Sequence, residues 1–87
     1  MKIKRGFVLK EIAGETVVVS TDSDLDLNGI ITLNSTAKTL WLALEVGVEG
    51  MDQLVSALTT EYDVDEATAL KAAEGFVNRL KELDFLD

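Results

Sequence analysis

Asp24, Asp26 and Asn28, followed directly by Gly29, have the residue types and the spacing that begin a calcium-binding loop. Carboxylate and amide oxygens are the ligands that calcium prefers, and the glycine permits a sharp turn. The twelfth position of such a loop requires a bidentate Glu, however, and here it is Ser35. The residues before the pattern are rich in valine and typical of a strand, where a calcium loop has an entering helix. We therefore expect a solvated acidic loop and no metal.

A second acidic cluster, formed by Glu61, Asp63, Asp65 and Glu66, has carboxylates of the kind used in acid–base chemistry. Asp63 and Asp65 also lie where a helix N-terminus favours an acceptor and a negative charge, so we interpret them as capping residues. The sequence has no His and no Cys, which excludes imidazole and thiolate catalysis and the metal sites built on those groups. It has no glycine-rich phosphate-binding loop either. We expect a protein that is not an enzyme and needs no cofactor.

The size and charge of the chain predict one domain over residues 1–87. The 87 residues are 47% hydrophobic, which is enough for a single modest core. The formal net charge of −8 repels phosphate backbones, so nucleic acid is a poor partner. Neither a secretory signal nor an apolar stretch of membrane-spanning length is visible. These features predict a cytoplasmic protein with no membrane partner, as a monomer or weak homodimer.

Three strands followed by three helices are expected to position these residues. Strand-prone runs on either side of Ala13-Gly14 indicate a β-hairpin, and from Asn34 onward apolar residues recur at three- and four-residue steps, as in amphipathic helices. The order favours an α+β fold of the winged helix-turn-helix type, βββααα. The strands are expected at about 7–12, 15–20 and 30–33, and the helices at about 35–46, 51–61 and 66–83.

The last predicted helix has an apolar stripe that is wider than so small a core needs. Leu70 and Val77 lie at the edge of the stripe, beside Glu74. If the short strand 30–33 lies at the edge of the sheet, it leaves unpaired amides next to this helix. An extended peptide can then add as a further strand, with backbone hydrogen bonds for affinity and side-chain pockets for selectivity. From the pattern alone, a broad helix face covered entirely by the hairpin is an equally good interpretation.

Several stretches of the sequence, which together extend over residues 6–86, point to a known family. They are GFVLKEIAGE (6–15), NGIITLNSTA (28–37), Leu40-Trp41, EYDV (61–64) and the closing stretch 76–86. In combination they resemble the PqqD-like proteins. These are small winged-helix-like peptide-binding domains, also called RiPP recognition elements, and the family takes its name from PQQ biosynthesis.

The resemblance implies that the protein binds the leader segment of a ribosomally synthesised precursor peptide. As a peptide chaperone it would present that leader to a peptide-modifying enzyme such as a radical SAM protein. The leader would lie antiparallel along the third strand and against the third helix. Carried over position by position, the peptide-binding residues are Ile30, Ile31, Thr32, Leu33, Leu70, Ala73, Glu74 and Val77.

Two alternative functions belong to other classes. A winged helix invites comparison with DNA-binding regulators, but acidic residues on the third helix and just after it outnumber its basic ones. The second alternative is a plain dimerising module whose apolar edge pairs with another copy. For a bound leader, the net charge of −8 favours Lys or Arg near the ends of the peptide. On the third helix and its end, the basic residues are Lys71, Arg79 and Lys81, and the acidic ones are Glu66, Glu74, Glu82 and Asp84.

Overall fold

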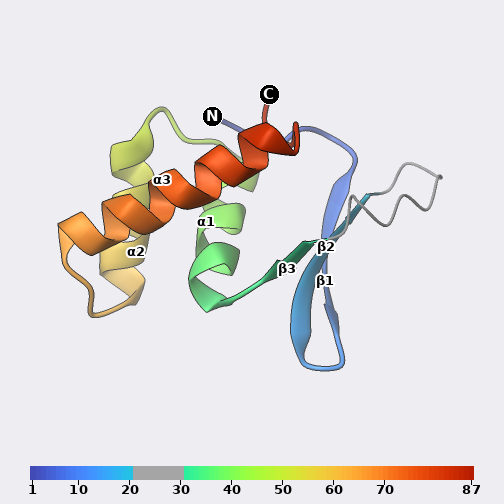
Figure 1. The fold of residues 1–87 in the computed structure, drawn as a ribbon, viewed down its shortest axis with the longest axis horizontal. Coiled ribbons are helices and arrows are strands. Elements are labelled where there is room, and N and C mark those ends of the chain that lie inside the picture. The colour runs from blue at the N-terminus through green and yellow to red at the C-terminus, as the bar shows by residue number, and fades with distance from the viewer. Residues whose placement is uncertain (21–30) are drawn as a thin grey trace.

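The computed structural model describes residues 1–20 and 31–87. Three antiparallel strands precede three helices, which confirms the predicted α+β fold class with the order βββααα (Figure 1). The calcium-like pattern, Asp24 to Gly29, and Ile30, the first residue of the predicted third strand, lie outside the described residues. The elements are β1 (Phe7–Ile12), β2 (Glu15–Ser20), β3 (Ile31–Leu33), α1 (Ser35–Val46), α2 (Met51–Glu61) and α3 (Glu66–Glu82).

The sheet has the order β1-β2-β3, so β3 pairs with β2, and no other strand in residues 1–20 or 31–87 pairs with its second edge. β1 and β2 form a hairpin in which Ile12 lies opposite Glu15. The two residues of its turn, Ala13 and Gly14, have φ values of 53° and 83°. Positive φ at both central positions is typical of the turn whose twist matches that of the flanking strands. The turn thereby fixes the register between β1 and β2.

This register determines which backbone groups point to the open edge of β3. Ile12 and Glu15 flank a two-residue turn and therefore form a hydrogen-bonded pair. The backbone groups of successive β2 residues then alternate between β1 and β3, so those of Val17 point to β1. The partner of Val17 in β3 is Thr32. The N–H and C=O of Thr32 therefore point away from β2, toward the open edge.

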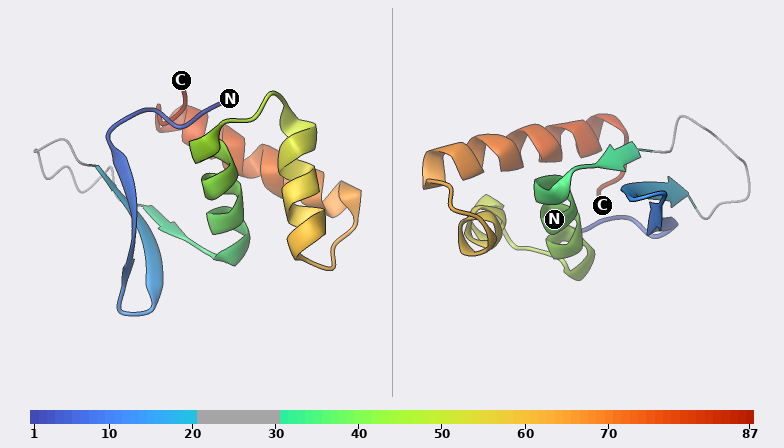
Figure 2. Two further views of the ribbon diagram at one scale, coloured as in Figure 1. Left: turned by 180° about the vertical axis from the view of Figure 1, so that it is seen from behind. Right: turned by 90° about the horizontal axis from the view of Figure 1, so that it is seen from below.

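α1 and α3 begin at residues with capping side chains, whereas α2 begins at Gly50, which has none. The Oδ1 of Asn34 accepts a hydrogen bond of 2.8 Å from the N–H of Ala37, and the Oδ1 of Asp65 accepts one of 2.8 Å from the N–H of Thr68. α1 ends at Gly47, whose φ of 104° suits a residue without a Cβ. Seen from below, α3 crosses over α1 and α2, and the sheet lies beside α1 (Figure 2).

The core joins one face of the sheet to the inner faces of all three helices. Trp41 is fully buried at its centre. The ring of Phe7, from β1, stacks on that of Phe85 with centroids 4.1 Å apart, and Trp41 meets both rings edge-on. These contacts hold the sheet against α1. None of the described helices is long and apolar enough to cross a membrane.

The first and last residues of the chain are held side by side. An isolated bridge joins Ile3 to Leu86. The N–H of Lys4 donates to the carbonyl of Phe85 at 2.9 Å, and the N–H of Asp87 donates to that of Lys2 at 2.9 Å. The terminal ammonium of Met1 also donates to the carbonyl of Val48 at 2.6 Å. The two ends therefore form a short antiparallel pair against the helices.

Candidate functional site

A groove of about 330 Å³ lies between β3 and one flank of α3, and we call it the β3–α3 groove. Thr32 lines it from β3, and the first turns of α1 close its end. From α3 it is lined by Lys71, Ala72, Gly75, Phe76 and Arg79. Its volume is in the range of ligand-binding clefts.

The floor of the β3–α3 groove is apolar and rigidly held. Leu40 of α1 and Phe76 of α3 both line the groove while being only 1% and 8% exposed, so they are anchored in the core. Ala37 and Ala72 add small side chains to the lining. An apolar side chain of a ligand would bury its surface on this floor with little rearrangement of the protein.

Gly75 lies in the middle of α3, where glycine costs about 0.5–1 kcal/mol relative to alanine. A Cβ added to it would meet no atom within 4 Å, so packing within the described residues does not require a glycine here. Gly75 does line the β3–α3 groove. The missing side chain therefore keeps the groove open where it would otherwise narrow.

A second opening, of about 610 Å³, continues along the sheet from the same place. It shares Thr32 and Asn34 with the β3–α3 groove and extends to the hairpin turn at Gly14. Lys38 lies at its side and donates a hydrogen bond of 2.7 Å to Glu11. This hydrogen bond, together with the charge of Lys38, lowers the pKa of Glu11. The second opening therefore lies at the end of β3, beside the start of β2, and shares Thr32 and Asn34 with the β3–α3 groove.

The other flank of α3 has a different groove, of about 390 Å³, which we call the α2–α3 groove. Val55 and Leu70 give it an apolar centre, and Asp52 and Glu66 put carboxylates at its rim. No strand lines it. Extended chains therefore find no free strand edge there.

The structure separates the peptide-binding residues expected from the sequence. In β3, Thr32 is exposed and lines the β3–α3 groove, whereas Ile31 and Leu33 point into the core and Ile30 lies outside the described residues. In α3, Ala73 and Val77 are buried, Leu70 lines the α2–α3 groove, and Glu74 is exposed and lines neither groove. The assignment of these residues to peptide binding stays a prediction.

The α3 residues that line the β3–α3 groove were not among those expected. Lys71, Gly75 and Arg79 are spaced four residues apart and so form one row along the helix. The apolar stripe of α3 identifies the buried face of the helix but not the faces beside it. The sequence did contain one signal for this row. It is a glycine in the middle of a strongly helical segment, with one cation four residues before it and another four residues after it.

Charge distinguishes the β3–α3 groove from the rest of the protein. Lys71 and Arg79 line it, and no Asp or Glu among residues 1–20 and 31–87 does. The ion pairs found among residues 1–20 and 31–87 join Lys4 to Asp84 and Lys38 to Glu11, so Lys71 and Arg79 take no part in them. In that same part of the chain, no group of three or more potential metal ligands comes together. The arrangement suits binding of an extended, partly apolar ligand.

Comparison with known proteins places this geometry in a family. Residues 7–86 match the family described as coenzyme PQQ synthesis protein D (PqqD). The chain is also similar to a solved structure described as "TbiB1 in Complex with the TbiA(beta) Leader Peptide", with a TM-score of 0.75 and 26% sequence identity, covering 100% of this chain and 95% of that one. No curated protein matches the chain. Because the family match extends over nearly the whole sequence, this chain belongs to the PqqD family.

Proposed function

We propose that the protein is a non-catalytic adaptor, which binds the leader segment of a ribosomally synthesised peptide and presents it to a modifying enzyme. Membership of the PqqD family and the similarity to a leader-bound structure support this role. The observation that carries it is the open edge of β3 beside an apolar groove that Gly75 keeps clear. These are the two features that strand addition requires, free backbone groups and pockets for side chains.

The leader would lie antiparallel along β3, between that strand and α3. The N–H and C=O of Thr32 would each form one hydrogen bond with its backbone. Every second side chain of the leader would face the floor formed by Leu40 and Phe76. The wall on α3 would consist of Ala72, Gly75 and Phe76, because Val77 is already committed to the core.

The chemistry would belong to the partner enzyme, for which a radical SAM protein is the class named by the family resemblance. The chain has no His and no Cys, and neither groove brings together a nucleophile and a base. We place this work in the cytoplasm, where a ribosomally made precursor is first available. PQQ biosynthesis and other modified-peptide pathways fit this role equally.

A titration of isotope-labelled protein with the leader peptide encoded beside its gene tests the proposal. Amide shifts are expected at residues 31–34 and along 71–79. Gly75→Trp should weaken binding at least about tenfold, because the indole fills the groove. The fold should persist, since nothing lies within 4 Å of the added Cβ.

The matched control is Asn78→Trp, which adds the same bulk to an exposed position of α3 that lines neither groove. It should bind the leader like the parent. Shifts confined to residues 1–12 or to α2, with Gly75→Trp binding as tightly as Asn78→Trp, would contradict the proposal. Turnover of a peptide by the purified chain alone would contradict the non-catalytic role.

A further inference from the structure

The β3–α3 groove has a local charge opposite to that of the protein. The chain has a formal net charge of −8, yet the charged residues that line this groove are Lys71 and Arg79. Both side chains are exposed, and neither is in an ion pair with a residue of the described chain. A ligand in the groove therefore contacts these two cations directly, whereas Glu74 and Glu82, each three residues from one of them on α3, line neither groove.

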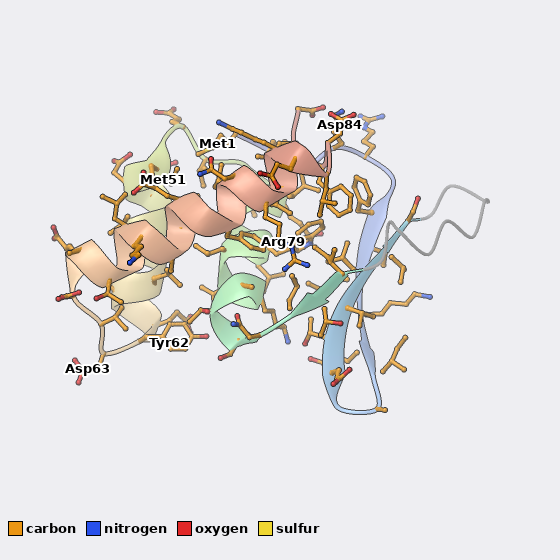
Figure 3. All side chains as sticks on the ribbon, viewed as in Figure 1. Met1, Met51, Tyr62, Asp63, Arg79 and Asp84 are labelled. Atoms are coloured by element: carbon orange, nitrogen blue, oxygen red, sulfur yellow. The ribbon has the colours of Figure 1, made fainter. Side chains whose placement is uncertain are left out.

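The helix dipole accounts for only one of these cations. Arg79 lies in the last turn of α3, where a positive charge is favourable in any helix. Lys71 lies in the second turn, too far from the C-terminus for that interaction. Figure 3 shows the side chain of Arg79 leaving α3 on the side of β3, in agreement with its place in the groove lining.

The spacing of the two cations matches the repeat of an extended chain. Lys71 and Arg79 are eight residues apart in a helix that rises 1.5 Å per residue, so their Cα atoms lie about 12 Å apart along its axis. Four residues of an extended peptide cover about 13 Å. In Figure 1, β3 runs toward α1 while α3 runs back toward the sheet. A peptide antiparallel to β3 therefore runs in the same general direction as α3.

Residues separated by two or four positions in a strand share one face. Suppose that one leader residue lies opposite Lys71 and that the residue four positions later lies opposite Arg79. These two residues and the one midway between them then all point to the α3 side of the groove. That middle side chain faces Gly75 and the apolar floor at Phe76. Gly75 lies midway between the two cations in the sequence, and an added Cβ there would meet no described atom within 4 Å, which leaves room for a central side chain.

We propose that the groove selects a leader in which an apolar residue has Asp or Glu two positions before it and two positions after it. This inference rests on the proposed function. The sequence of such a segment reads acid-x-apolar-x-acid. The net charge of the chain favours a basic leader, but the groove lining favours the opposite choice. Lys71 and Arg79 are specificity-determining residues in this arrangement, and Gly75 leaves room for the central side chain of the leader segment.

Selection of displayed random 12-residue peptides on the purified parent tests this inference. The enriched pool should contain the acid-x-apolar-x-acid pattern. For a peptide from that pool, changing both acids to their amides should weaken binding about three- to tenfold, as expected for two exposed ion pairs. The double variant Lys71→Glu/Arg79→Glu should instead enrich peptides with Lys or Arg at the same two positions.

The matched control is Lys10→Glu/Lys81→Glu, which makes the same change in net charge at exposed positions outside the groove. It should keep the acidic preference of the parent. If parent and control both enrich peptides without that preference, this inference is overturned while the proposed function stands. If the parent enriches no peptide, or only peptides that Gly75→Trp binds equally well, the proposed function is overturned as well.

Discussion

The two flanks of α3 differ in what they offer to a ligand. Both have an opening of similar size that includes apolar side chains, about 330 Å³ on the β3 side and about 390 Å³ on the α2 side. The β3 side adds two cations and an open strand edge, whereas the α2 side adds Asp52 and Glu66 between two helices. The N–H and C=O groups within a helix are bonded to each other. Apolar area alone therefore does not make a site for an extended peptide, which needs free backbone partners as well.

A buried ridge on α3 separates the two grooves. Ala69, Ala73 and Val77 are at most 1% exposed and face the core, so they support both flanks without lining either groove. A change in this ridge should affect both grooves, and a change in one flank should affect only that one.

The largest effect is expected from Val77→Asp, which puts an unpaired carboxylate into the ridge. Burying such a charge should lower the free energy of unfolding by about 3–5 kcal/mol. Urea unfolding followed by the fluorescence of Trp41 measures the loss. Leu70→Asp is the matched control, because Leu70 is 40% exposed and its new carboxylate stays in water. Equal stability of the two variants would contradict the position of the ridge.

A smaller effect, on binding only, is expected from Thr32→Pro. Proline removes the N–H that points to the open edge, and an edge strand tolerates it because that group does not pair with β2. Leader affinity should fall about tenfold, because the complex loses one backbone hydrogen bond and the alignment of the leader with β3 that this bond maintains. Thr32→Val retains the N–H and should bind like the parent. Equal affinities of the two variants, measured by calorimetry, would exclude strand addition at β3.

The N-terminus of α3 should contribute to stability in a pH-dependent way without affecting either groove. Hydrogen bonds from Thr68, from its side chain and then its backbone, lower the pKa of Asp65 below its ordinary value of 3.8. A pKa lowered by folding stabilises the folded state above that value, and the contribution disappears as the pH falls through the lowered pKa.

Asp65→Ala should therefore be slightly less stable than the parent at pH 7, and the difference should become smaller in acid, because the protonated carboxyl keeps its acceptor but loses its charge. Asp65→Asn retains an oxygen acceptor but has no charge and cannot titrate, so its stability should lie between those of Asp65→Ala and the parent at pH 7. Thermal unfolding between pH 2 and pH 7 compares the three proteins. An undiminished difference between Asp65→Ala and the parent at pH 2 would show that the carboxylate charge is not its cause.

The smallest effect is expected from Leu70→Ser in the α2–α3 groove. The leader should bind this variant within about twofold of the parent, since rim changes outside an interface contribute little. The same titration that detects the Gly75→Trp defect provides the measurement. A loss as large as that of Gly75→Trp would place the leader on the α2 side of the helix and reverse the comparison.

The sequence was sufficient for the order of elements and for most of their ends. Ala13-Gly14 sets the hairpin, and Asn34 and Asp65 were among the candidates for the helix caps that the structure contains. Such features depend on interactions within a few residues, which short-range patterns record directly.

The residues that line the groove could not be predicted from the sequence pattern. Leu70 and Val77 both lie at the edge of the apolar stripe, yet Leu70 is 40% exposed toward α2 and Val77 is 1% exposed. The direction in which each one faces is decided by the packing of α3 on α1 and α2, a tertiary contact. Lys71 and Arg79 become neighbours of Thr32 only once that packing and the sheet register are both fixed.

The pairing of the two chain ends has a consequence for how the domain can be combined with other proteins. Residues 2–4 and 85–87 are bonded to each other, so a linker of a few residues would join them and allow new ends to be opened at the exposed turn of Ala13-Gly14. A circular permutant of this kind keeps β3 and α3 intact. By the same geometry, a larger protein can carry the domain as an insertion in one of its surface loops, entering and leaving at a single point.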